Sequence, residues 1–181
     1  MPELPEVQTT VAGIKPYLID TKIERLVIRQ PQLRWPVTQG IEATAKGLKI
    51  ENVSRRAKYI IVSLTNGSFL IHLGMSGSLR LIANTDVLKK HDHIQMYLSN
   101  GHVLTFHDPR RFGCWLWREH DHPLLEKLGP EPLSSNFSGE YLWNRARKRT
   151  APVKSFIMDS RIVVGVGNIY ANEALFESGI K

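Results

Sequence analysis

The first residues of the chain combine a proline and two acids that could carry out covalent chemistry. Once Met1 is removed, Pro2 becomes the N-terminus, and its secondary amine, which titrates near pH ~8, is partly unprotonated at neutral pH. Such an amine can attack an electrophilic carbon and form an iminium, the Schiff-base chemistry more often given to lysine. Glu3 could transfer protons for that attack, and Glu6 follows one helical turn later.

The element that must position Pro2 and Glu3 is a helix that starts beside them. Prolines and acidic side chains suit a first helical turn, so a plain helix start is the favoured interpretation of this stretch alone. Apolar residues recur along it at spacings of three and four, at Leu4, Val7, Val11, Ile14 and Leu18. We therefore predict an amphipathic helix that ends near Pro16 and fixes the N-terminus against a second layer.

The middle of the chain has the pattern of short strands joined by tight turns. Asn66-Gly67 and Asn100-Gly101 each separate two apolar runs, and Asn-Gly is a strong hairpin signal. Further β-rich runs lie near residues 22–30, 48–53, 79–82 and 115–117. We expect about eight strands in an antiparallel sandwich or barrel, with the N-terminal helix against it.

A change of composition divides the chain near residue 130. Leu128-Gly129-Pro130-Glu131-Pro132 has the glycine and prolines of a linker, so we predict domains at 1–130 and 131–181. The second domain should be helical. Ser138 can cap a helix that reaches about Lys148, a second helix covers 153–158, and a third covers 169–178 with Gly179 as its stop.

Composition limits the class of protein. The hydrophobic share of 42% can build a core, and no apolar run is long enough to span a bilayer, so we expect a cytoplasmic protein. Cys114 is the only cysteine, which excludes an internal disulfide and a cysteine zinc site within this sequence. The net charge of +7 favours a polyanionic partner, most simply nucleic acid.

Two motifs could bind phosphate. Gly165-Val166-Gly167-Asn168 opens the third predicted helix, where glycines let backbone amides approach an anion and the Asn168 side chain could add a donor. An ordinary glycine turn with an asparagine cap explains the same residues. Lys58 begins a strand, where its ammonium could reach a phosphate or a base, or could simply occupy a strand edge.

Two loops combine arginine with large apolar side chains, as in proteins that open a DNA duplex. Asp108-Pro109-Arg110-Arg111-Phe112-Gly113 places two guanidiniums beside an aromatic ring, and Met75 lies between two glycine turns. A core methionine and structural arginines are the alternative. The histidines at 91, 93, 102 and 107 could be taken for a metal site, but their spacing fixes no third ligand, and we predict no metal in this chain.

Taken together, these motifs resemble formamidopyrimidine-DNA glycosylase in order and spacing along the whole chain. The resemblance rests on Pro2-Glu3-Leu4-Pro5-Glu6-Val7, Arg55-Arg56-Ala57-Lys58-Tyr59, His72-Leu73-Gly74-Met75-Ser76-Gly77, Asp108-Pro109-Arg110-Arg111-Phe112-Gly113 and Val164-Gly165-Val166-Gly167-Asn168-Ile169-Tyr170. Leu4 and Val7 favour this family over endonuclease VIII, which usually carries a glycine after Pro-Glu. The resemblance implies an α+β fold, in which an N-terminal helix lies on a β-sandwich and a helix-two-turn-helix domain begins afterwards.

The resemblance also implies a base-excision-repair enzyme, a bifunctional DNA glycosylase and AP lyase. Its substrates would be oxidised purines such as 8-oxoguanine, and formamidopyrimidines. Pro2 would attack C1′ of the damaged nucleotide, Glu3 would move the sugar and base protons, and Lys58 would contact the lesion nucleotide and its phosphate. The imine would then allow β- and δ-elimination of both flanking phosphates. Glu6 and Glu173 would be supporting acids in the same site.

The remaining matched residues would hold the DNA. The gap left by the flipped nucleotide would be filled by Met75, Arg110 and Phe112, with Arg110 also facing the orphaned base. His91 and Arg111 would be further DNA contacts, and Asn168 would bind phosphate. The implied partner is double-stranded DNA that contains oxidised purines or abasic sites. We expect a monomer in the bacterial cytoplasm, without a membrane partner.

The family pattern continues past the last residue of this sequence, through the rest of the helix-two-turn-helix region and a four-cysteine zinc finger that one cysteine cannot form. We therefore expect no cofactor in this chain. Each missing phosphate contact removes roughly one unit from the salt slope of DNA binding, so we expect weak affinity and reduced or absent excision. Two alternatives stay open, a non-catalytic DNA-binding remnant and an endonuclease VIII-like glycosylase for oxidised pyrimidines.

Overall fold

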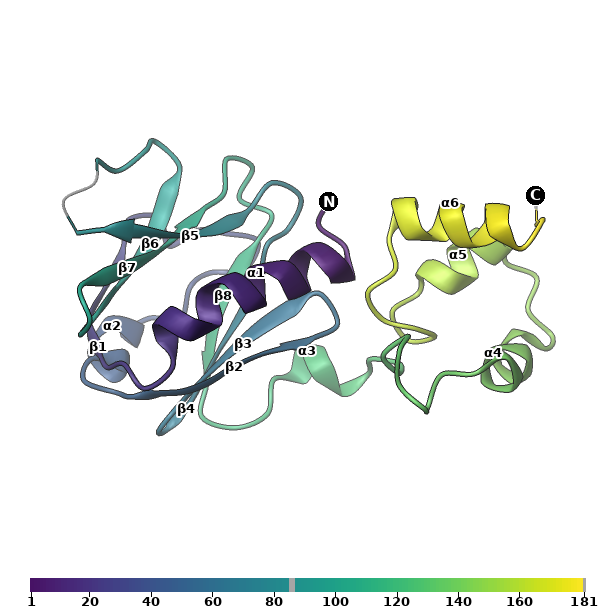
Figure 1. Ribbon diagram of the computed structural model, residues 1–181, viewed down its shortest axis with the longest axis horizontal. Coiled ribbons are helices and arrows are strands. Elements are labelled where there is room, and N and C mark those ends of the chain that lie inside the picture. Colours follow the sequence, from purple (N-terminus) through teal and green to yellow (C-terminus); the bar gives the residue numbers. More distant parts are fainter. Residues whose placement is uncertain (85–86, 181) are drawn as a thin grey trace.

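The computed structural model describes residues 1–84 and 87–180, so Lys181, the last residue of the predicted second domain, lies outside the described residues. The molecule is elongated and has two lobes (Figure 1). One lobe, the sandwich lobe, consists of β-strands and a long helix. The other, the helical lobe, contains the helices α4, α5 and α6. The predicted boundary near residue 130 stays a prediction.

Within the described residues, eight strands form two antiparallel four-stranded sheets, in the orders β1-β6-β7-β5 and β2-β3-β4-β8. This confirms the predicted α+β sandwich. The strands are β1 Ile23–Ile28, β2 Ile50–Arg56, β3 Tyr59–Leu64, β4 Gly67–His72, β5 Ser78–Ala83, β6 Asp92–Leu98, β7 His102–His107 and β8 Cys114–Arg118.

Both predicted hairpins are present. Leu64 pairs with Gly67 in the β3–β4 hairpin, which leaves a two-residue turn at 65–66. The β6–β7 hairpin turns through residues 99–101, and Gly101 has φ +83°, the left-handed conformation that glycine adopts without a steric cost.

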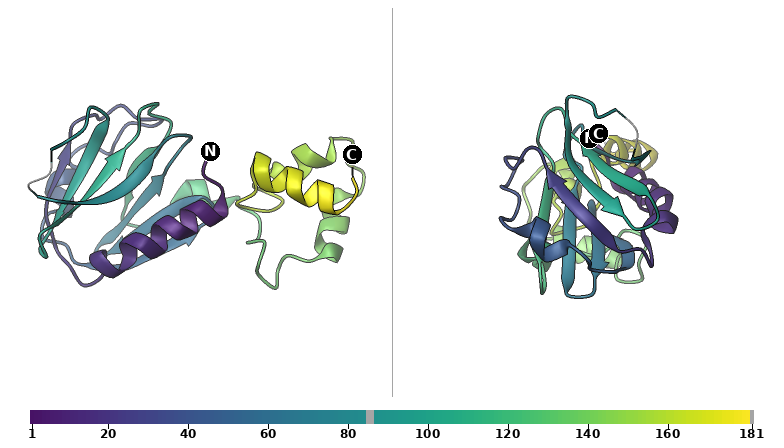
Figure 2. Two further views of the ribbon diagram at one scale, coloured as in Figure 1. Left: turned by 45° about the horizontal axis from the view of Figure 1, so that its top comes forward. Right: turned by 90° about the vertical axis from the view of Figure 1, so that its left-hand side faces the viewer.

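Helix α1, Leu4–Leu18, contacts β2, β3 and β5, and buries Val7, Val11, Ile14 and Leu18. The predicted end near Pro16 is wrong, since Pro16 lies inside the helix. A proline so close to the C-terminus removes one hydrogen bond, and complete burial of Leu18 holds the last residues in place. Figure 2 shows that the first turn of α1 points toward the helical lobe.

Two short helices were not predicted, α2 Ile41–Ala45 and α3 Pro123–Glu126. They are too short to show the periodicity of an amphipathic helix. The sandwich core between the sheets is filled by large buried side chains, among them Phe69, Phe106 and Trp115.

The helical lobe has the three predicted helices, α4 Gly139–Ala146, α5 Val153–Met158 and α6 Asn168–Glu177. The Ser138 hydroxyl caps α4 by accepting from Tyr141 N–H at 3.1 Å. The helix ends before the predicted Lys148, because Arg147 already has a non-helical ψ of 135° and Lys148 has φ +62°, so neither residue continues an α-helix. Gly179, with φ +64°, ends α6 as predicted, and the Ile180 N–H bonds to the Leu175 carbonyl beyond it.

Candidate active site

The Glu3 carboxylate lies at the N-terminus of α6, in the helical lobe. It accepts hydrogen bonds from the N–H groups of Gly167, Ile169 and Tyr170 at 2.7, 2.8 and 3.2 Å. Glu3 is 2% exposed. The backbone amides and the dipole at this helix end favour a negative charge, and the carboxylate is buried from water there.

This arrangement shows what the glycine motif binds within the chain. The sequence left open whether the backbone amides that open α6 receive a phosphate or form an ordinary turn, and in this structure they donate to the Glu3 carboxylate. The Asn168 side chain is exposed beside them. Its predicted phosphate contact stays a prediction.

Two glycines allow the close approach of the lobes. A Cβ atom on Gly167 would lie 2.5 Å from Glu3 Cδ, and one on Gly165 would lie 2.5 Å from Leu4 Cδ1. Gly165 also has φ +85°, and its carbonyl accepts from Leu4 N–H at 3.1 Å. The glycine motif therefore packs closely against the first residues of α1.

Lys58 reaches the same segment from the sandwich lobe. Its Nζ donates to the Val166 carbonyl at 2.9 Å. Burial lowers the pKa of Lys58 below its ordinary value, and the charges of Glu3 and Glu6 act against that shift. A partly desolvated ammonium close to two carboxylates is suited to hold an anionic group or to exchange a proton.

A carboxylate clamp positions the turn before Lys58. Glu131 accepts from the guanidiniums of Arg55 and Arg56 at 2.7 and 2.9 Å, and from Ala57 N–H at 2.8 Å. Burial acts to raise the pKa of Glu131, but these hydrogen bonds lower it on balance. The clamp joins the predicted linker to the turn between β2 and β3, where Ala57 has φ +54°.

Pro2 and Glu6 lie beside Glu3 at the start of the chain, and Glu173 lies on α6. Pro2 precedes Glu3 and is half-buried, with its nitrogen in amide linkage to Met1 in the sequence as written. Glu6 Oε2 accepts from the Glu3 N–H at 2.8 Å, which fixes the first turn of α1. Glu173 is exposed on α6, about one turn after Tyr170.

The predicted duplex-opening residues are exposed on two adjacent loops. Met75 and Phe112 are each 44% exposed, and Arg110 and Arg111 are exposed as well. The Arg110 Cζ lies 4.8 Å from the centre of the Phe112 ring, a cation–π contact. The alternative of a core methionine is therefore wrong for Met75. In Figure 1 the loops before β5 and β8 lie at the end of the sandwich where the chain begins.

The histidines around His91 form a network of rings and hydrogen bonds. The His91 ring meets those of His93 and His107 edge to face, with centres 6.1 and 5.9 Å apart. His107 Nδ1 and Arg80 both bond to Asp92 Oδ1, at 2.8 and 2.7 Å. Within residues 1–84 and 87–180, no group of three or more His, Cys, Asp or Glu side chains could hold a metal ion.

His72 and Tyr59 are site residues that motif reasoning did not single out. Their rings lie 4.9 Å apart, and together with Lys58 they line a hollow of about 160 Å³. Burial, then the charges of Arg34 and Lys58, lowers the pKa of His72 to about 4, so its ring is neutral at neutral pH. Its Nδ1 accepts from Gly74 N–H at 2.9 Å, which leaves the proton on Nε2. Tyr59 directly follows Lys58 in the sequence, and His72 lies three residues before Met75.

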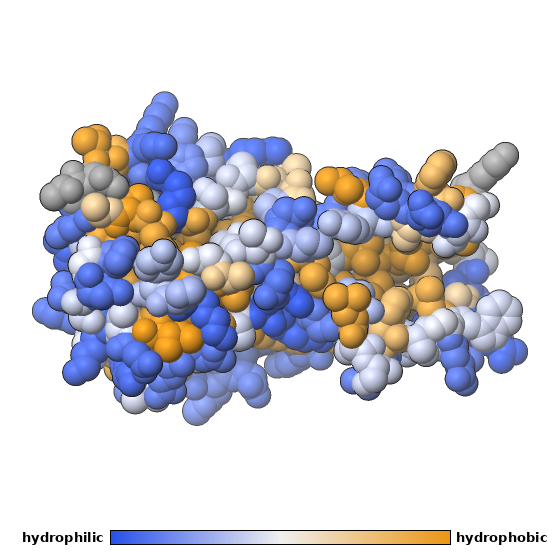
Figure 3. Space-filling model, viewed as in Figure 1, coloured by the Kyte–Doolittle hydropathy of each residue, from blue (hydrophilic) through white to orange (hydrophobic). Residues whose placement is uncertain are grey.

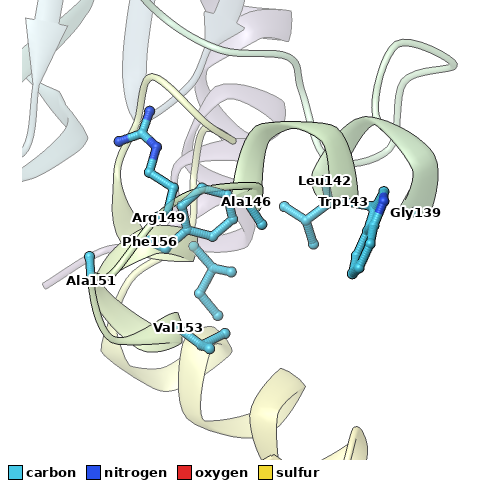
Figure 4. A pocket seen from close by; sticks show the side chains of 9 residues that line it. Gly139, Leu142, Trp143, Ala146, Arg149, Ala151, Val153 and Phe156 are labelled. Atoms are coloured by element: carbon cyan, nitrogen blue, oxygen red, sulfur yellow. The ribbon is translucent and has the colours of Figure 1, made fainter.

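Two apolar hollows that involve the helical lobe lack the chemical groups of this site. One, of about 330 Å³, lies between α4 and α5, where Leu142, Trp143 and Phe156 line it together with Arg149 (Figure 4). A second, of about 530 Å³, is lined by apolar side chains of both lobes, and apolar surface is visible in this lobe in Figure 3. Neither contains a carboxylate or an amine nucleophile among its lining residues.

No helix in the described part of the chain is both long and apolar enough to cross a membrane.

The chain matches two family models. Residues 1–115 match the formamidopyrimidine-DNA glycosylase N-terminal domain, and residues 128–181 match the formamidopyrimidine-DNA glycosylase H2TH domain. Curated relatives named formamidopyrimidine-DNA glycosylase come from bacteria. The protein from Marinobacter nauticus is 53% identical over 99% of this chain and 67% of its own length, and that from Cellvibrio japonicus is 53% identical over 100% and 68%. The chain thus spans about two thirds of their length.

Solved structures agree with the sequence matches. The complex between the Lactococcus lactis enzyme and DNA containing an abasic site has a TM-score of 0.91 and 30% identity, covering 99% of this chain and 68% of that one. A mutant of the same enzyme with Fapy-dG containing DNA gives the same TM-score, identity and coverage. On its sequence, its sandwich fold and its Pro2–Glu3 site, this chain belongs to the formamidopyrimidine-DNA glycosylase family.

Proposed function

We propose that this chain is a base-excision-repair DNA glycosylase and AP lyase that acts on oxidised purines and formamidopyrimidines in double-stranded DNA. One observation carries the proposal. Glu3, the residue after Pro2, is buried against the N-terminus of α6, and Lys58 donates to the same segment. Three groups of the proposed reaction, on Pro2, Glu3 and Lys58, therefore lie in one region of the molecule.

In the proposed reaction the Pro2 amine, free after loss of Met1, attacks C1′ of the damaged nucleotide. The bond between C1′ and the base breaks, and the base leaves with the bonding electrons and takes up a proton. Glu3 follows Pro2 in the chain, and its carboxylate would move the protons of the base and sugar. The amine nitrogen loses its proton, and its lone pair forms the C1′=N bond of the iminium while the bond between C1′ and the sugar ring oxygen O4′ breaks and O4′ takes up a proton. The iminium acidifies the C2′ hydrogen. Loss of that proton expels the 3′ phosphate by β-elimination, and loss of a further proton, from C4′, expels the 5′ phosphate by δ-elimination.

The nucleophile can reach C1′ only after the nucleotide leaves the helix stack, which costs a few kcal/mol. The exposed Met75, Arg110 and Phe112 are suited to fill the resulting gap and so offset that cost. Lys58 and His72, which line one hollow, can both donate to a phosphate, and the net charge of +7 favours DNA at long range. Because its proposed substrate is chromosomal DNA, we place the protein in the bacterial cytoplasm.

Borohydride trapping tests the proposal directly. The chain, with removal of Met1 verified by mass spectrometry, is mixed with duplexes that contain an abasic site, 8-oxoguanine or an oxidised pyrimidine. We expect a covalent adduct with the abasic duplex, a reduced or absent adduct with 8-oxoguanine, and a large loss of the abasic adduct in the Pro2→Gly variant. Any adduct that forms on 8-oxoguanine should be lost in the Glu3→Gln variant. Absence of an adduct between the wild-type chain and abasic DNA would leave the non-catalytic DNA-binding alternative.

The duplex with an oxidised pyrimidine tests the remaining alternative, an endonuclease VIII-like glycosylase. A preference for the oxidised pyrimidine over 8-oxoguanine would favour the endonuclease VIII-like enzyme. A solved complex of the Lactococcus lactis protein with DNA containing an oxidised pyrimidine makes this comparison necessary.

A further inference from the structure

The Met75 loop (residues 73–77) and the Arg110 loop (residues 108–113) lie side by side because of strand pairing. The Met75 loop leads from β4 to β5, and the Arg110 loop leads from β7 to β8, so both cross between the two sheets. His72 pairs with Cys114 at one end, and Ser78 pairs with His107 at the other. The fold thus brings together two loops that are about thirty residues apart in sequence.

One buried carboxylate connects the loops. Asp108 is completely buried, and its Oδ1 accepts from the Ser76 hydroxyl at 2.8 Å while its Oδ2 accepts from Gly113 N–H at 2.8 Å. The Ser76 oxygen in turn accepts from Arg110 N–H at 3.3 Å. The carbonyl of Asp108 bonds to His93 Nε2 at 2.8 Å, which anchors the group to β6.

The backbones of the two loops also approach each other closely. A Cβ atom on Gly74 would lie 2.5 Å from the Phe112 carbonyl carbon, and Gly74 has φ +64°. A Cβ on Gly113 would lie 2.5 Å from the His72 carbonyl oxygen. Without space for side chains at these two positions, neither loop can shift far without the other.

We propose that Asp108 and Ser76 are positioning residues that hold Met75, Arg110 and Phe112 as one preformed wedge before DNA is bound. The proposal rests on the proposed function and deepens it. Met75 and Phe112 are about half exposed and do not pack onto the protein. The reason is that the hydrogen bonds from Ser76 and Gly113 to the Asp108 carboxylate fix both loops. A preformed wedge avoids the entropy cost of ordering the loops while the duplex is opened.

The chemistry of the link predicts which substitution preserves it. An amide in place of the carboxylate can accept from Gly113 N–H through its oxygen and donate to the Ser76 hydroxyl through its nitrogen. Asp108→Asn therefore keeps both bonds, whereas Asp108→Ala removes both. Ser76→Ala removes the connection between the loops at a half-buried position and leaves the Gly113 bond in place.

The test measures duplex opening apart from chemistry. A duplex with a tetrahydrofuran abasic analogue and 2-aminopurine beside it reports unstacking by fluorescence when the chain binds. We expect opening to fall roughly tenfold in Asp108→Ala and Ser76→Ala, the size expected for a lost hydrogen bond to a charged group, and to recover in Asp108→Asn. The double Ala variant should be no worse than Asp108→Ala, because both changes break one link.

Two controls make the outcome specific. Ser68→Ala removes a hydroxyl bond of similar length, to His122 at 3.0 Å, at the opposite end of β4, and should open the duplex like wild type. Borohydride trapping on single-stranded abasic DNA needs Pro2 but no wedge, and should stay within about twofold of wild type in both loop variants. Thermal unfolding verifies that each variant is folded, and the half-buried Ser76 gives a second variant if Asp108→Ala does not fold.

Wild-type opening by Asp108→Ala or Ser76→Ala, failure of Asp108→Asn to recover, or an equal loss of single-stranded trapping would overturn the proposal. A wild-type chain that opens the duplex but traps no abasic DNA would refute the proposed function alone, since fluorescence still reports on the wedge.

Discussion

At Gly167 a single added methyl group tests the geometry of the candidate site. A Cβ atom there would lie 2.5 Å from Cδ and 2.6 Å from Oε1 of Glu3. Because non-bonded carbon atoms pack at about 3.5–4 Å, Gly167→Ala must separate α6 from Glu3 by about 1 Å. Gly167 has φ −128°, which alanine adopts freely, so the contact and not the backbone causes the effect.

The separation acts on three hydrogen bonds at once. The Glu3 carboxylate accepts them at 2.7, 2.8 and 3.2 Å, and an increase of about 1 Å takes each beyond bonding range. Each bond to a charged group contributes about 1.5–3 kcal/mol, although relaxation recovers part of the sum. We expect the free energy of unfolding to fall by about 3 kcal/mol, which lowers Tm by roughly 6–12 °C in a chain of this size.

The rate of adduct formation should fall further, by about a hundredfold, because a catalytic group misplaced by about 1 Å can cost that much. Single-turnover borohydride trapping on an abasic duplex measures this rate, at a temperature where the variants are folded. Gly13→Ala is the matched control, since a Cβ there meets nothing within 4 Å inside α1. It should trap like wild type and be more stable by up to about 1 kcal/mol. Equal unfolding and trapping by the two variants would refute the role assigned to the contact.

Three other ionisable groups give measurable effects. Burial acts to raise the pKa of Glu131, but hydrogen bonds hold it below 4.5, so its stabilisation is present above that pH and is lost as pH falls through the lowered value. Glu131→Gln should therefore lower the free energy of unfolding, measured in urea, by about 2 kcal/mol at pH 7, and this loss should shrink as the pH falls further below 4.5. A loss that stays the same at every acidic pH would contradict the assignment. The His72 pKa, lowered to about 4 by burial and two neighbouring cations, means that the unfolded chain takes up a proton first as pH falls. Stability should thus decline between about pH 6.5 and 4 by up to about 3 kcal/mol, and His72→Asn should flatten that slope. Burial raises the pKa of the Cys114 thiol to about 12, so a thiol reagent should label it only on unfolding, and rapid labelling of the native chain would disprove its burial.

The local elements could be predicted from the sequence because their causes are local. Apolar spacing placed α1, Asn-Gly pairs placed both hairpins, and Ser138 and Gly179 marked helix ends. The family motifs also identified the residues of the candidate site, whose individual roles stay predictions. The errors in local structure, the end of α1 and the end of α4, arose where burial or one left-handed residue overrode the pattern.

The sequence by itself determined which residues could do chemistry, with Pro2 and Glu3 at the start of a helix. Only the tertiary structure decided what those residues touch. Glu3 bonds to Gly167, 164 positions away, Lys58 reaches Val166 across 108 positions, and Ser76 meets Asp108 across 32. Contacts of this kind depend on how the lobes and sheets pack, which no local spacing encodes. For that reason the glycine motif, whose amides could have bound a phosphate, instead binds the Glu3 carboxylate of the same chain.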